Sequence, residues 1–178
     1  MRDIMDLSIE DRVALCLAYA EQTLCYFEHE FNDGMYDLAF ERFRSNISLG
    51  YDWLAGKKIN WEVPYELCND DERENGCFNF VAIYECSAEY ETPSSVLIWT
   101  LYYFIYQCAH STHEKYFPQD LWDGSLPMEE EKKVIDSLNT DVSSYLSAEA
   151  CEILRGIEDK FFAKSEGVYD GIKGNDKR

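Results

Sequence analysis

Two histidines and a glutamate lie close together in the segment HSTHE, where His110, His113 and Glu114 follow a long apolar run. Imidazole and carboxylate groups are ligands of zinc and iron, and a spacing of three residues places both histidines on one face of a helix. The zinc-protease motif H-E-x-x-H differs, because its histidines are four residues apart with the glutamate between them. Histidines near the end of a helix also interact well with its dipole and last carbonyl groups. We expect this structural role, without a bound metal or cofactor.

Other residue types that carry chemistry give no catalytic pattern. The sequence has no G-x-S-x-G, P-loop or G-x-G-x-x-G motif. Glu85 and Glu89 are one helical turn apart, but the paired E-x-x-H motif of carboxylate-bridged iron bundles is absent. The seven cysteines form no C-x-x-C pair, so no zinc or redox motif is indicated. A cysteine nucleophile would need one of only three histidines, and the sequence does not pair them. We therefore expect a protein that is not an enzyme.

The charge of the chain restricts its partners. Sixteen lysines and arginines oppose 35 aspartates and glutamates, which leaves a formal net charge of −19 over 178 residues. Such an excess repels itself and exceeds what solubility requires. Phosphate groups would be repelled, so we expect neither nucleic acid nor a membrane surface as the partner. The natural complement is a basic protein.

The acidic residues concentrate in the middle of the chain. Residues 61–131 hold fifteen acidic residues, opposed only by Arg73 and Lys115. An ordinary solvated surface is one explanation. The same segment also contains aromatic residues, and aromatic anchors surrounded by charge are typical of tight protein interfaces. The residues that we expect to bind a partner are Glu66, Asp70, Asp71, Glu72, Glu74, Glu85, Glu89, Tyr90, Glu91 and Trp122.

The apolar run before HSTHE predicts the centre of the fold. It extends over residues 96–109, whereas a bilayer-spanning helix needs about 20 apolar residues. A helix that is apolar on all sides is typically buried on all sides. We therefore predict a central buried helix at about 93–111, capped by Thr92, with Pro93 as its first residue. Trp99 and Phe104 should both be buried in it.

Amphipathic segments surround this central helix. Ser8 is a natural N-cap for a helix that ends before Gly34, and a second helix over 36–54 ends at Gly56, so the two should form an antiparallel hairpin. Further helices are predicted to begin near Pro64, Cys77, Pro127 and Ser147. The helix at 77–91 should turn Phe78, Val81, Ala82 and Cys86 inward.

These elements predict an all-α fold. We expect a single-domain bundle of roughly six or seven helices over residues 1–165, with a flexible polar tail at 166–178. The beginning of the chain, MRDIMDLSIEDR, lacks the apolar region of a signal peptide, and the cysteine usage fits a reducing compartment. We therefore expect a cytoplasmic protein. Its oligomeric state is left open.

Hydrophobic patterns of the chain resemble those of the all-helical immunity proteins of bacterial polymorphic and contact-dependent toxin systems. The resemblance lies in VALCLAYAEQTLCYFEHEF, in YDWLAGKK and in FVAIYECSAEYETPSSVLIWTLYYFIYQCA, and it extends from Ser8 to about Phe162. It implies an antitoxin that binds and neutralises one cognate toxin domain, such as a basic nuclease. The family supplies no site residues, because its members diverge where they contact their toxins. Two alternatives remain: a metal-binding helical enzyme that uses His110 and His113, and an acidic adaptor or nucleic-acid mimic.

Overall fold

The computed structural model describes residues 4–69, 77–85, 87–112, 118 and 142–173. Within these residues the chain forms six α-helices and two short 3-10 helices, and no strand. The predicted all-α class is therefore confirmed. Of residues 78, 79, 85 and 165–173, only the backbone is described.

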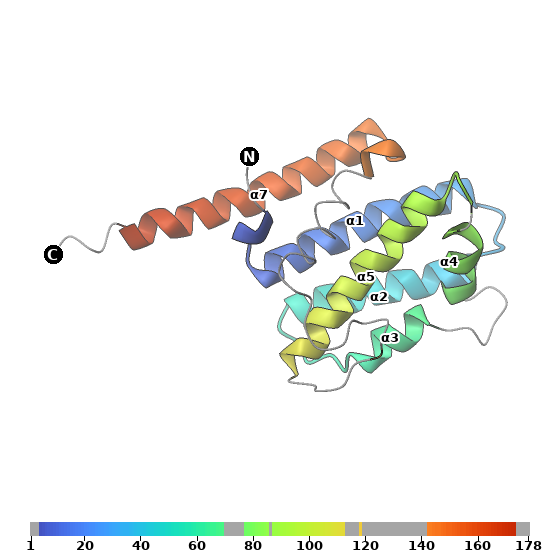
Figure 1. The fold of residues 1–178 in the computed structure, drawn as a ribbon, viewed down its shortest axis with the longest axis horizontal. Coiled ribbons are helices and arrows are strands. Elements are labelled where there is room, and N and C mark those ends of the chain that lie inside the picture. The colour runs from blue at the N-terminus through green and yellow to red at the C-terminus, as the bar shows by residue number, and fades with distance from the viewer. Residues whose placement is uncertain (1–3, 70–76, 86, 113–117, 119–141, 174–178) are drawn as a thin grey trace.

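The first two helices form the predicted antiparallel hairpin (Figure 1). Helix α1 spans Ile9–Glu30, and the backbone N–H of Asp11 donates to the Ser8 side-chain oxygen at 3.1 Å, which confirms Ser8 as the N-cap. Helix α2 spans Asp37–Leu54. Its end is a Schellman motif, in which Gly56 adopts a φ of 82° and its N–H donates to Trp53 O at 2.9 Å. The N–H of Lys57 donates to Asp52 O at 3.0 Å, which completes the motif.

Helix α5, at Glu91–Ser111, is the predicted central helix. It packs most extensively against α1 and also contacts α2, α3 and α4. Phe104 is fully buried, as predicted, but the prediction for Trp99 is wrong, because this side chain is 37% exposed. Trp99 lies edge-on to Tyr102, with their ring centroids 6.4 Å apart. An apolar composition does not reveal which side of a helix faces a gap between its neighbours, and the side that carries Trp99 and the half-buried Tyr102 is the one left partly uncovered.

Two short helices connect the hairpin to α5. Helix α3 spans Glu62–Cys68 and contacts α2 and α5, and helix α4 spans Cys77–Glu85. Helix α4 is shorter than predicted, and its inward face agrees with the prediction only in part. Val81 is buried as predicted, but Ala82 is exposed, so the prediction for Ala82 is wrong. Cys77 and Phe80 are also buried, and the side chains of Phe78 and Cys86 lie outside the described part.

The C-terminal helix α7 spans Ala148–Lys173 and follows the 3-10 helix η3 at Val142–Ser144. The predicted cap at Ser147 is confirmed, because its side-chain oxygen accepts the N–H of Ala150 at 3.2 Å. One half of α7 lies along α1, and its C-terminal half extends past the other helices (Figure 1). The backbone thus stays helical beyond residue 165, where the sequence predicted a tail. In the described part of the chain, no helix is both long enough and apolar enough to cross a membrane.

Candidate partner-binding surface

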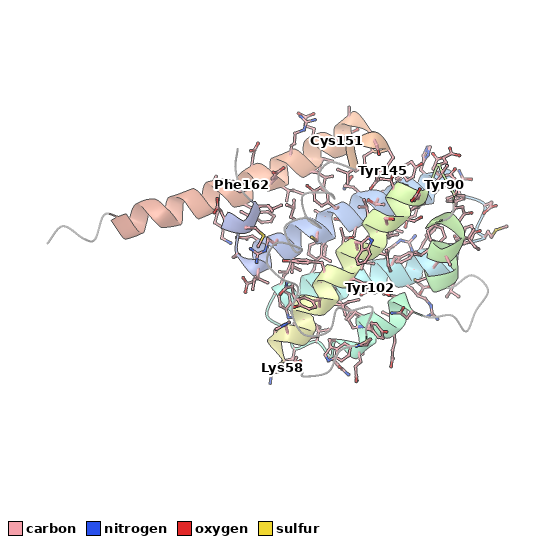
Figure 2. All side chains as sticks on the ribbon, viewed as in Figure 1. Lys58, Tyr90, Tyr102, Tyr145, Cys151 and Phe162 are labelled. Carbon is pink, nitrogen blue, oxygen red and sulfur yellow. The ribbon has the colours of Figure 1, made fainter. Side chains whose placement is uncertain are left out.

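One end of the helical bundle gathers acidic side chains from three parts of the chain. They come from the end of α1, from the turn between α1 and α2, and from the turn that leads into α5. We call this region the bundle-end surface and define it as Tyr26, Glu30, Asp33, Glu89, Tyr90 and Glu91. Its four acidic residues are exposed, and both tyrosines are half-buried. Figure 2 shows Tyr90 at this end of the bundle.

Aromatic rings lie directly beneath the bundle-end surface. Phe80 of α4 is fully buried, and its ring centroid lies 5.0 Å from that of Phe27, 5.1 Å from that of Tyr36 and 5.4 Å from that of Phe40. The Tyr90 ring joins this cluster through Phe31, at 5.2 Å. Tilted and edge-to-face ring pairs are favourable beyond the area that they bury. The exposed acids therefore stand on a closely packed aromatic layer.

Electrostatic effects link these residues across the surface. Burial raises the pKa of the Tyr26 hydroxyl, and Glu30, Tyr90 and Glu89 raise it further. The pKa of Tyr90 is also raised, first by burial and then by Glu89 and Glu30. A nearby negative charge opposes ionisation of a phenol. Glu30 of α1 and Glu89 of the turn before α5 both raise the pKa of the two tyrosines, so both carboxylates lie close to both rings.

A hollow of about 460 Å³ adjoins this surface, between α1 and the start of α7. Tyr26 and Tyr145 line it, and their ring centroids are 5.2 Å apart with planes inclined by 57°. The Tyr145 hydroxyl lies 2.7 Å from Thr23 Oγ1, so a hydrogen bond to α1 fixes this ring. Glu30 brings a carboxylate to the rim, which joins the hollow to the bundle-end surface.

The structure brings together only some of the predicted binding residues. Glu89, Tyr90 and Glu91 lie at the bundle end, where they meet Glu30 from α1. Glu66 is exposed on α3, the helix that is tied to the middle of α5 by a hydrogen bond from Tyr102 Oη to Asn69 Oδ1 (2.9 Å). Glu85 lies on α4, but its side chain is outside the described part. Also outside the described residues are Asp70, Asp71, Glu72, Glu74 and Trp122.

Sequence reasoning missed Tyr26, Glu30 and Tyr145. Tyr26 and Glu30 are one turn apart on α1, and this spacing was the only local signal. The contact of Tyr26 with Tyr145 joins residues that are far apart in the chain. A single sequence contains no information on that pairing, because it arises from how α7 docks on α1.

The histidine motif is only partly within the described structure. His110 lies in the last turn of α5, where it is exposed, with its ring 5.0 Å from that of Tyr106. This position is the helix-end location that the sequence favoured. His113 and Glu114 lie outside the described residues, so the metal hypothesis is untested. Among the side chains that the structure describes, no three His, Cys, Asp or Glu residues form a group that could hold a metal.

Comparison with known proteins finds no matching family model, no matching curated protein and no matching solved structure. The resemblance to helical immunity proteins therefore stays a prediction.

Proposed function

We propose that this protein is an acidic immunity protein that binds a basic toxin domain and neutralises it stoichiometrically in the cytoplasm. The observation that carries the proposal is the bundle-end surface, where exposed carboxylates surround tyrosines seated on a packed aromatic layer. Binding interfaces are typically built from buried aromatic anchors within a polar rim. The activity requires no catalysis and no cofactor.

Charge supports a basic partner. The chain carries −19, and complementary charge speeds the encounter of two proteins. A nuclease is a fitting target, because it needs lysines and arginines to hold phosphate groups. Carboxylates that pair with those cations would block the substrate-binding side of such an enzyme. A further acidic segment precedes Glu89, Tyr90 and Glu91 in the sequence, and we include it in the proposed interface. It contains Asp70, Asp71, Glu72 and Glu74.

Protection of cells is the direct test of this function. The toxin-domain reading frame next to the gene for this chain is expressed in a bacterial host, with and without the chain. Growth should stop with the toxin domain alone and recover when the chain is co-expressed, and the two proteins should co-purify in a fixed ratio. If the chain gives no protection and no complex forms, the proposal is wrong.

A variant pair separates protection by the bundle-end surface from a general effect of charge. Reversing Glu30, Glu89 and Glu91 to lysine should reduce protection. Reversing Glu10, Glu41 and Asp159 changes the net charge by the same amount at exposed positions outside the bundle-end surface, and it should leave protection largely intact. Because all six residues are exposed, both variants should fold.

A further inference from the structure

The hollow between α1 and the start of α7 has an aromatic wall and an acidic rim. Tyr26 and Tyr145, whose rings pack against each other with centroids 5.2 Å apart, form the wall, and Glu30 supplies the rim. The face of an aromatic ring attracts cations, and the attraction grows when the cation loses water. A carboxylate beside the rings adds charge attraction. Rings and carboxylate together make a place suited to a positively charged group.

The charges around this hollow leave the carboxylate available. The described residues that line the hollow include no lysine and no arginine. His29 Nδ1 lies 3.4 Å from Glu30 Oε1, but the His29 side chain is 87% exposed and solvent weakens this contact. Glu89 adds a second negative charge near Tyr26.

The groove between α1 and α2 differs from this hollow, because a cationic side chain lines it. It has a volume of about 320 Å³ and is lined by Glu21, Glu28 and Arg44. The Arg44 guanidinium already contacts the Glu28 carboxylate there at 2.7 Å. That groove therefore contains its own cation, whereas the described lining of the hollow beside Tyr26 does not.

We infer that the hollow beside Tyr26 and Tyr145 binds one lysine or arginine side chain of the basic partner. The inference rests on the proposed function and names the anchor of that interaction. The cationic head lies against the two rings and within reach of Glu30. The aliphatic stem packs against Leu146 and Ala150, which also line the hollow. The hydrogen bond between Tyr145 and Thr23 holds the Tyr145 ring in place before the partner binds. Less side-chain entropy of Tyr145 is therefore lost on binding.

The binding of a single cationic side chain can be measured without the partner. The probe is the blocked tripeptide acetyl-Gly-Arg-Gly-amide, titrated into the full chain with the tyrosine ring signals followed by NMR. The control is the same peptide with citrulline, which keeps the shape of arginine and lacks its charge. We expect saturable shifts of the Tyr26 and Tyr145 signals with the arginine peptide, and at least about fivefold weaker binding of the citrulline peptide, which corresponds to roughly 1 kcal/mol.

Two variants and a control locate the site. Glu30→Gln removes the charge but keeps the shape, and Tyr26→Leu removes the ring but keeps an apolar side chain. Each should weaken the arginine peptide severalfold, while Glu21→Gln in the α1–α2 groove should leave its binding unchanged. Glu30 is exposed, so Glu30→Gln remains informative even if Tyr26→Leu is poorly folded. Equal binding of both peptides, or no saturable shift at the two rings, would overturn the inference.

The proposed function can fail separately from this inference. If the toxin domain binds with the same dissociation rate to the parent and to Glu30→Gln, and the peptide does not bind, the immunity function stands and the anchor is wrong. If the arginine peptide binds at the two rings and the adjacent toxin domain does not bind, the cation site stands and the proposed partner is wrong.

Discussion

Gly50 shows how single residues set the spacing of the helices. It is buried in α2, and a Cβ built at this position would lie 2.6 Å from Leu17 Cδ2 of α1. Real Cβ atoms do not approach other atoms so closely, so Leu17 or a helix would have to move. Leu17 is fully buried and has little room to do so. The absence of a side chain at Gly50 therefore lets the two helices pack at this distance.

We predict that Gly50→Ala destabilises the fold. Overpacking a core typically costs about 1–3 kcal/mol, and the better helix propensity of alanine returns up to about 1 kcal/mol. The free energy of unfolding in urea should therefore fall by up to about 2 kcal/mol. The matched control is Gly156→Ala in α7, where an added Cβ meets nothing within 4 Å, so stability should rise by about 0.5–1 kcal/mol. A Gly50→Ala protein that gains stability as Gly156→Ala does would contradict the close approach.

The cysteines differ strongly in their surroundings, which predicts their reactivity. Burial raises the pKa of Cys77 to about 12 and that of Cys108 to about 11, and it raises that of Cys68 well above its usual value. Cys25 is exposed, and its pKa is raised by burial and then by Glu28 and Glu21. Only the thiolate reacts with alkylating reagents, so a raised pKa means slower reaction at neutral pH.

In the folded protein, iodoacetamide at about pH 8 should therefore modify Cys25 well before Cys68 and Cys77. Peptide mapping by mass spectrometry gives the rate at each site. The rate at Cys25 should keep rising above the ordinary thiol pKa of 9.0, and Glu28→Gln should shift its pH profile to lower pH, because a negative charge is removed. Modification of Cys68 in the native state as fast as that of Cys25 would contradict the described burial.

At the scale of elements, apolar side chains of α7 dock this helix on the core, and Ile157 and Phe161 pack against it while partly buried. Leu154 and Phe162 are buried against the core cluster, and Lys164 Nζ lies 2.9 Å from Asp11 Oδ1 of α1. The Lys164 side chain is 65% exposed, so this ion pair contributes at most about 1 kcal/mol. Apolar burial therefore provides most of the docking energy. Figure 2 shows Phe162 on α7.

We predict that Phe162→Ala loosens α7 without unfolding the bundle. Removing a buried phenylalanine typically costs about 3–5 kcal/mol of stability. Here the lost stability belongs to the contact between α7 and the core. Hydrogen exchange should become faster in α7, while α2 and α5 keep their protection. The control Ile153→Ala changes a side chain that is 47% exposed, so exchange should change little. Faster exchange throughout the molecule after Phe162→Ala would show that α7 is an integral part of the core.

The sequence predicted the helices better than their faces and exact ends. The caps at Ser8, Gly56 and Ser147 are confirmed, because each depends on a local hydrogen bond or on a positive φ. Thr92 was expected as the cap and Pro93 as the first residue of α5, but that helix begins at Glu91 and its N-cap is Tyr90, so the cap prediction is wrong. Proline is tolerated at any of these early positions, because the first N–H groups of a helix have no partner within it. Local signals therefore fix a helix end only to within a residue or two.

Tertiary packing determines which side of each helix faces inward, and local sequence patterns do not. Local pattern does not distinguish Phe80 from Ala82 as the inward residue of α4, since both lie in a continuous apolar run. The exposure of Trp99 depends on which neighbours cover α5. The candidate site follows the same rule. Glu89, Tyr90 and Glu91 were found from composition, whereas Tyr26, Glu30 and Tyr145 became visible only once α1, α5 and α7 had been placed together.

For the whole molecule, the net charge of −19 and the uneven distribution of the acidic residues are the main constraints on function. Self-repulsion of this size opposes compaction, so a partner that neutralises it gains in both affinity and speed of encounter. Exposed charges chiefly set the association rate, and salt reduces their effect. A basic partner should therefore bind fastest at low ionic strength.

The most direct test of this account is the association rate of the chain with the partner that we propose, a toxin domain from a neighbouring reading frame, measured by stopped-flow fluorescence over a range of salt concentrations. The account predicts rapid association that slows as salt increases. The reversal of Glu30, Glu89 and Glu91 should slow it at low salt by about tenfold or more, and more than the charge-matched reversal of Glu10, Glu41 and Asp159. No association, or equal rates for the parent and both variants at every salt concentration, would contradict binding through the bundle-end surface.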